Sequence, residues 1–153
     1  MLMLSDHFSL EELVFSQAAA RKGLANDLNA FHLAALKRLC VTLLEPLREA
    51  LGRPLKISSG YRSPAVNRAV GGAPESAHLK GCAADVTAQG LTPEQIGQIA
   101  LAHKLPFQQL IAEFGSWVHL SVPDKISMPP AREMLIATRL PSGTVAYSRW
   151  SAR

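Results

Sequence analysis

The chain has 153 residues, of which 48% are hydrophobic, and this is enough to build one domain around its own core. It contains no run of about 18 apolar residues, which excludes a membrane-spanning helix, and its two cysteines are too few for a disulfide framework. We therefore predict a single domain over residues 1–153, without an integral membrane segment and with Cys40 and Cys82 as buried free thiols.

The net charge of +4 favours an anionic partner, and nucleic acid, an anionic membrane surface and the bacterial cell wall would each attract it. Lysine and arginine are scattered along the chain, so the net charge is explained equally well by surface residues that only keep the protein in solution. We predict a monomer without a nucleic-acid partner. The first residues, Met1-Leu2-Met3-Leu4, lack the basic flank and the long apolar stretch of a signal peptide, so we expect synthesis as a soluble cytoplasmic protein.

Two helices are predicted before residue 52. Ser9-Leu10-Glu11-Glu12 has the pattern of a capping box, in which the serine and the second glutamate satisfy free backbone N–H groups at a helix start. Between Phe31 and Leu51, apolar residues recur at spacings of three and four, which is typical of an amphipathic helix. Pro46 should kink this helix, and Gly52-Arg53-Pro54 should end it.

Two further helices have clear start signals. Ser63-Pro64 combines an N-cap residue with proline at the first helical position, and this helix should run to about Val70 and stop at Gly71-Gly72. Thr92-Pro93-Glu94-Gln95 repeats the signal for a helix that ends near His103.

The predicted strands lie mostly after the helices. Leu55–Ser58 is a short candidate, and Gln109–Phe114 and Trp117–Val122 form a pair separated by Gly115-Ser116. The tail, residues 127–153, suggests another strand pair with a turn at Pro141-Ser142-Gly143, and no chemistry is evident in it. Helices first and paired strands later favour an α+β fold.

The alternation of side chains along two predicted strands indicates which residues share a face and are candidates for a functional site. If residues 81–86 form a strand, Asp85 shares one face with Gly81 and Ala83, while Cys82 faces away. The small neighbours leave room around Asp85 for a metal and a substrate. Together with two histidines, one carboxylate makes a ligand set that leaves the fourth position of tetrahedral Zn²⁺ open for chemistry.

The second strand places His119 on the same face as Trp117 and Ser121, opposite an apolar face. A lone histidine on a strand is more often structural than a ligand, but His78 and Asp85 supply the rest of a ligand set. Whether Glu113 joins them depends on the turn. A three-residue loop would pair Glu113 with Trp117, on the face of His119, whereas a two-residue loop would turn it away.

Two motifs carry a resemblance to a known family. Ser76-x-His78-x-x-Gly81-x-Ala83-x-Asp85, followed by Trp117-Val118-His119, resembles the zinc D-alanyl-D-alanine carboxypeptidase family, whose relatives include vancomycin-resistance dipeptidases, phage endolysin peptidases and the hedgehog domain. Further segments fit the same pattern and extend the resemblance over nearly the whole chain: Phe8–Glu12, Ser59–Ser63, Asn67 and Gly71-Gly72.

The resemblance implies roles for individual residues. The zinc ligands would be His78, Asp85 and His119. Arg62 would neutralise a developing oxyanion or hold a substrate carboxylate, and Ser76 would line the metal site. Independently of the resemblance, Trp117 has two equally good interpretations, as a wall of the substrate pocket or as a partly buried aromatic residue that fills space.

The resemblance is less direct for the general base. Many members carry an acidic residue three positions before the last histidine, where this chain has Ser116. Glu113, six positions before His119, is the only nearby carboxylate, and we assign the base to it.

The resulting hypothesis is a small α+β zinc peptidase, with a small antiparallel sheet that carries the zinc site and packs against helices. It would act on peptidoglycan stem peptides as a D-Ala-D-Ala carboxypeptidase, be of phage or prophage origin, and reach the cell wall by release or by phage machinery. One alternative is an endopeptidase that cuts between L-alanine and D-glutamate. Another is a non-catalytic zinc-binding interaction module, which the departure at Ser116 supports.

Overall fold

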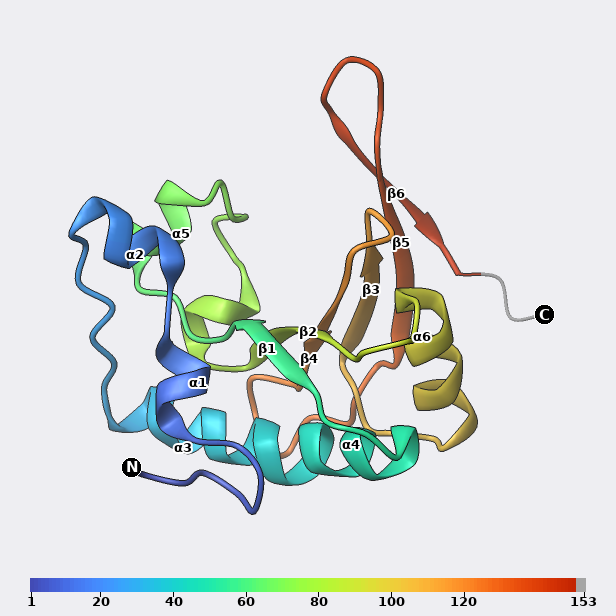
Figure 1. The fold of residues 1–153 in the computed structure, drawn as a ribbon, viewed down its shortest axis with the longest axis horizontal. Coiled ribbons are helices and arrows are strands. Elements are labelled where there is room, and N and C mark those ends of the chain that lie inside the picture. Colours follow the sequence, from blue (N-terminus) through green and yellow to red (C-terminus); the bar gives the residue numbers. More distant parts are fainter. Residues whose placement is uncertain (151–153) are drawn as a thin grey trace.

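The computed structural model describes residues 1–150, in which one mixed sheet carries helices against one of its faces (Figure 1). The helical elements, in chain order, are α1 (Leu10–Val14), α2 (Gln17–Lys22), α3 (Ala30–Leu39), the π-helical turn η1 (Cys40–Leu44), α4 (Glu45–Leu51), α5 (Pro64–Ala69), the 3-10 turn η2 (Ala77–Lys80) and α6 (Pro93–Ala102). None of the helices within residues 1–150 has both the length and the apolar character that a membrane crossing requires.

The sheet has six strands in the order β1-β2-β4-β3-β5-β6. These strands are β1 (Lys56–Ser59), β2 (Ala83–Thr87), β3 (Gln109–Glu113), β4 (Trp117–Ser121), β5 (Glu133–Arg139) and β6 (Val145–Arg149). All neighbouring pairs are antiparallel except β3 and β5, which are parallel. The α+β class is confirmed, although the sheet is larger than the small antiparallel one expected.

The predicted amphipathic helix forms as a continuous run from α3 through η1 to α4. Proline at position 46 has no N–H, and its ring would clash with the carbonyl of Thr42 in a regular helix. The chain widens into one π-helical turn just before it, where the N–H of Glu45 donates to the carbonyl of Cys40. Gly52 ends the run with a φ of +66°, as its left-handed C-cap.

The helices also begin at the predicted N-cap residues. Ser9 and Glu12 make both bonds of the capping box at α1, and Thr92 and Gln95 do the same at α6. Ser63 caps α5, which reaches Val70 as its C-cap. The short helix α2 was not predicted. It begins at a Ser16 cap, contacts α5 and buries Ala19 alone, so it lacks the apolar stripe that indicates a helix in a sequence.

The core lies between the sheet and the helices α3, α4 and α6. Alternate residues of β3 and β4 are fully buried there: Leu110, Ala112, Val118 and Leu120. Of these, Leu110, Val118 and Leu120 pack in one cluster with Leu36, Leu43 and Leu47 of the helical run. Cys40 and Cys82 are buried and free, as predicted, and burial raises the pKa of the Cys40 thiol to about 12.

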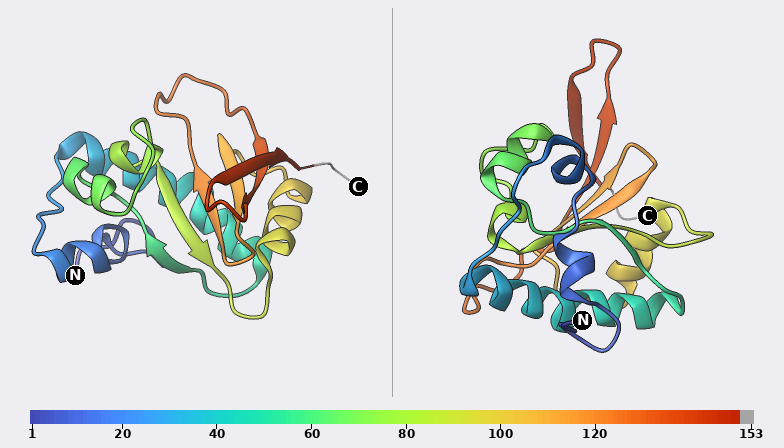
Figure 2. Two further views of the ribbon diagram at one scale, coloured as in Figure 1. Left: turned by 90° about the horizontal axis from the view of Figure 1, so that it is seen from above. Right: turned by 60° about the vertical axis from the view of Figure 1, so that its left-hand side comes forward.

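The last two strands form the predicted hairpin, with Pro141-Ser142-Gly143 in its turn. The turn end of this hairpin projects from the body of the protein, as the right-hand view of Figure 2 shows. The predicted segment continued to Arg153, but residues 151–153 lie outside the part of the chain that is described.

Candidate active site

His78 is presented by the short turn η2. Ser76 begins this turn, and its Oγ accepts a hydrogen bond from the His78 N–H at 3.3 Å. Gly81 ends it with a φ of +73°, and a Cβ at this position would lie 2.8 Å from the carbonyl oxygen of His32. Gly81 therefore belongs to the turn and not to the strand expected over residues 81–86, which begins at Ala83. Within β2, Asp85 shares a face with Ala83 as predicted, because side chains alternate from Ala83 onward. Cys82 precedes the strand and, contrary to expectation, is among the residues that border the cleft.

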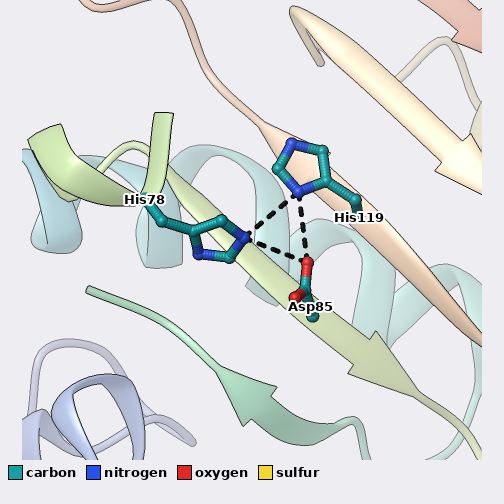
Figure 3. Close-up of side chains that lie close together, drawn as sticks. All are labelled: His78, Asp85 and His119. Carbon is teal, nitrogen blue, oxygen red and sulfur yellow. Dashed lines mark hydrogen bonds and ion pairs between the residues drawn. The ribbon is translucent and has the colours of Figure 1, made fainter. Parts of the chain in front are cut away.

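His78, Asp85 and His119 converge at one point on the sheet (Figure 3). Asp85 on β2 and His119 on β4 are direct cross-strand partners, and His78 reaches them from η2. His78 Nε2 lies 3.1 Å from Asp85 Oδ1, His119 Nδ1 lies 3.1 Å from the same oxygen, and the two nitrogens are 3.2 Å apart. Within residues 1–150 this is the group of side chains whose donor atoms are close enough to share a metal ion.

The three donor atoms fit a zinc ion. Bonds of about 2.0–2.2 Å at tetrahedral angles set neighbouring donors about 3.3–3.6 Å apart, so shifts of a few tenths of an ångström would admit the ion. His78 Nδ1 lies 2.7 Å from the carbonyl oxygen of Gly60, which can only accept a hydrogen bond. Nδ1 therefore carries the proton, and the Nε2 lone pair of the neutral ring points into the cluster, as metal-binding histidines require.

Charge and burial keep the ligands in the forms that bind metal. Burial alone would raise the pKa of Asp85, but hydrogen bonds with His119 and His78 outweigh it and hold this pKa well below its usual value. Burial lowers the pKa of His78, which is 2% exposed, and so favours the neutral imidazole.

Glu113 lies on the same face as the cluster. Strands β3 and β4 pair Glu113 with Trp117 and Ile111 with His119, so the turn between them has three residues. Burial raises the pKa of Glu113, and the negative charge of Asp85 raises it further. A carboxylate of this kind is poised closer to neutral pH than an exposed one, which suits proton transfer. The buried Nε1 of Trp117 lies beside it without reaching hydrogen-bond geometry with an acceptor among residues 1–150.

Comparison with known proteins agrees with this geometry. The family model described as Peptidase M15 matches residues 6–121. The chain belongs to the Peptidase M15 family. Members of this family are zinc peptidases, so the chain is a peptidase, and its His78, Asp85 and His119 cluster could bind a metal ion. None of the curated proteins compared with the sequence matches it.

In this M15 chain, Arg62 contacts one member of the candidate metal-binding cluster. Its Nη2 donates to Asp85 Oδ2 at 3.2 Å, which leaves Oδ1 directed at the two histidines. Its Nε donates to Ser59 Oγ at 3.1 Å, and its Nη1 donates to Asn67 Oδ1 at 3.3 Å. Each guanidinium nitrogen therefore has an acceptor within the protein. The carboxylate that Arg62 contacts in this structure is that of Asp85, a candidate metal ligand.

Two glycines of the motifs are explained by close packing around this network. A Cβ on Gly60 would lie 2.2 Å from the carbonyl oxygen of Leu13, so α1 could not approach the segment that holds His78. A Cβ on Gly72 would lie 2.0 Å from Asn67 Oδ1, which is the acceptor for Arg62. Both positions need glycine, because a side chain would displace the backbone of α1 at Gly60 and the acceptor of Arg62 at Gly72.

The cluster opens into a cleft of about 1130 Å³. Arg62, Ser76, Glu113 and Trp117 line it, together with the three candidate ligands. It also extends over β5 and β6, where sequence analysis found no chemistry. The sequence signal for this region was a suggested strand pair with a turn at Pro141-Ser142-Gly143, which does not reveal that β5 joins β3.

Proposed function

We propose that this M15 peptidase is a zinc enzyme that hydrolyses peptide bonds in the stem peptides of bacterial peptidoglycan. The observation that carries the proposal is the convergence of His78, Asp85 and His119 beside a carboxylate, Glu113, on one face of the sheet. When bound, zinc would polarise a substrate carbonyl and lower the pKa of the attacking water. His78, Asp85 and His119 would hold the ion and leave one position open.

Glu113 would act as the general base. It is half-buried on the face of the ligands, and its raised pKa fits a group that accepts a proton from water and then delivers it to the leaving amine. The acidic residue expected three positions before the last histidine is replaced by Ser116, which is exposed and hydrogen-bonds to the carbonyl of Phe114. Glu113 would fill this role from the opposite strand of the same hairpin.

The remaining predicted residues would orient the reactants. Arg62 would hold Asp85 in position and bring positive charge near the reacting carbonyl, because its guanidinium borders the cleft as well as contacting the carboxylate. Trp117 would form one wall of the substrate pocket, and Ser76 would keep the η2 turn in the shape that presents His78.

Within this function we propose D-Ala-D-Ala carboxypeptidase specificity, a phage or prophage source and action at the cell wall after release or delivery. Cleavage between L-alanine and D-glutamate is the alternative specificity on the same scaffold. The proposal rests on the motifs shared with the resembling family and on the basic charge of the chain, which suits an acidic polymer.

Digestion of purified sacculi tests both the activity and its specificity. The zinc-loaded protein should release new peptide termini, and mass spectrometry of these termini identifies the bond that is cut. Protein stripped of metal by a chelator should release none, and activity should return when zinc is added. If the zinc-loaded protein binds the ion but produces no new termini, the interaction-module alternative replaces the enzyme.

A further inference from the structure

The face of the sheet that carries the metal cluster continues without interruption onto the last two strands. The register places His119, Ile111, Leu135 and Arg149 in one row across β4, β3, β5 and β6, and it places Trp117, Glu113, Ala137 and Tyr147 in the next row. The part of the cleft formed by the β5–β6 hairpin consists of side chains from these rows and their neighbours: Glu133, Leu135, Arg139, Val145 and Tyr147. The match to the M15 family ends at residue 121, before this hairpin begins.

Phe114 lies in the turn between β3 and β4, and its ring contacts Arg139 of the β5–β6 hairpin. It has a φ of +56°, a left-handed conformation that is unfavourable for a bulky side chain. This backbone directs its half-buried ring between two partners. The Arg139 guanidinium lies 4.7 Å from the ring centroid, and the Trp117 ring packs edge-on at 5.5 Å. The turn between Glu113 and Trp117 requires this conformation, since Gly115 also has a positive φ of +65°, and it places the ring where it contacts Arg139 of β5.

Arg139 is a fixed positive charge at the cleft. Besides the Phe114 ring, it contacts the Gly143 carbonyl, to which its Nη1 donates at 3.4 Å. It is exposed and forms no salt bridge within residues 1–150. A planar guanidinium that is held by an aromatic face and still has free N–H groups suits a carboxylate, which it can bind through two parallel hydrogen bonds.

We propose that the β5–β6 hairpin extends the substrate-binding cleft and that Arg139 binds a carboxylate of an acidic peptide substrate. This inference rests on the proposed function, because it takes the cleft to be the peptide-binding site. Arg139 lies two strands and four residues away from His119, which is about 16 Å along the sheet. Allowing for the length of the arginine side chain, an extended peptide covers this distance with about three to four residues. The substrate is therefore longer than a dipeptide.

The test measures binding separately from cleavage. The probes are a stem pentapeptide with a free D-glutamate carboxylate, the same peptide with this group amidated, and the dipeptide D-Ala-D-Ala. Calorimetry on zinc-loaded Glu113→Gln protein gives the dissociation constants without turnover, and wild-type protein is assayed for cleavage of the same peptides. Arg139→Gln is the test variant, made in both backgrounds. Arg149→Gln is its control, because Arg149 is an exposed arginine on the same face of the same hairpin, opposite Leu135, but is not among the residues that line the cleft.

Arg139→Gln should weaken binding of the free-acid pentapeptide about tenfold, the order expected for one charge-assisted hydrogen-bonded pair. It should leave the amidated pentapeptide and the dipeptide unaffected. In wild-type protein the change should raise KM and leave kcat within about twofold, with an unaltered melting temperature. Arg149→Gln should keep the preference for the free acid.

Several outcomes separate this inference from the proposed function. If the pentapeptides are cleaved but Arg139→Gln keeps the preference for the free acid, the carboxylate site is wrong while the hydrolase stands. If Arg139 discriminates between the two pentapeptides and neither is cleaved, the carboxylate site stands and the hydrolase is wrong. Equal loss of binding for both pentapeptides, or no binding of either, also overturns the carboxylate site.

Discussion

The two faces of the central sheet are built from the same strands and have opposite properties. On the face toward α3, α4 and α6, Leu110, Val118 and Leu120 are fully buried and pack against the helices. On the other face, one residue along in each strand, Asp85, Glu113 and His119 line an open cleft. Because side chains alternate with a period of two, neighbours in the sequence serve different purposes. We call the face packed against the helices the closed face and the face that lines the cleft the open face. We expect substitutions on the closed face to reduce stability, and substitutions of the candidate site residues on the open face to reduce peptidase activity.

The largest expected effect is at the metal ligands of the open face. His119→Ala and Asp85→Ala each remove one of the three candidate donors, so bound zinc and peptidase activity should both fall to near background. Elemental analysis after dialysis measures the zinc, and His103→Ala at the end of α6 serves as the control. Stoichiometric zinc in both ligand variants would show that the metal, if any, is bound elsewhere.

The second largest expected effect is the loss of activity when Glu113, the proposed general base, is replaced. Glu113→Gln keeps the shape of the side chain but cannot accept a proton, so kcat should fall about 100-fold or more while zinc content and melting temperature are kept. Glu133→Gln is the control, since Glu133 lines the same cleft but is exposed and accepts a hydrogen bond from Gln109 at 2.7 Å. Equal activity of wild-type and Glu113→Gln protein would remove the base assignment.

A substitution on the closed face should give the reverse result. Leu120 follows His119 directly and is fully buried, so Leu120→Ala should lower the free energy of unfolding by about 2–5 kcal/mol. The kcat per folded molecule should stay close to wild type. Urea unfolding measures the loss, and the exposed residue Thr138 on β5 offers a control, Thr138→Ala, that should change stability by less than about 0.5 kcal/mol. A Leu120→Ala protein that is stable but inactive would contradict the division between the faces.

The smallest effect concerns the helical layer behind the closed face. Burial alone would raise the pKa of Glu45, but hydrogen bonds from Ser5 and His7 outweigh it and lower this pKa. A lowered folded-state pKa adds stability above the unfolded value of about 4.3, and this stability is lost as the pH falls through the folded-state value. Glu45→Gln should therefore be less stable than wild type by about 1 kcal/mol or less at pH 7. Chemical unfolding at pH 7 and at successively lower pH should show the difference shrinking, and a constant difference would exclude a contribution from the charge.

Much of the local structure follows from the sequence because its signals act over a few residues. The caps at Ser9, Ser63 and Thr92 satisfy N–H groups one turn away, and Pro46 disturbs the helical turn that precedes it. Alternation placed His119 on the polar face of its strand. The motif around His78 and Asp85 indicated the family, which the match over residues 6–121 confirms.

The remaining features depend on contacts between distant segments, and only the tertiary structure decided them. Glu113 faces His119 because the hairpin turn has three residues, and the sequence alone allowed either turn length. The direction of Arg62 toward Asp85 depends on acceptors from Ser59 and Asn67. The last two strands join the cleft because β5 pairs in parallel with β3 across an intervening loop. Sequence periodicity reports which face a side chain takes within its own strand, but it carries no information on which strand lies next to it.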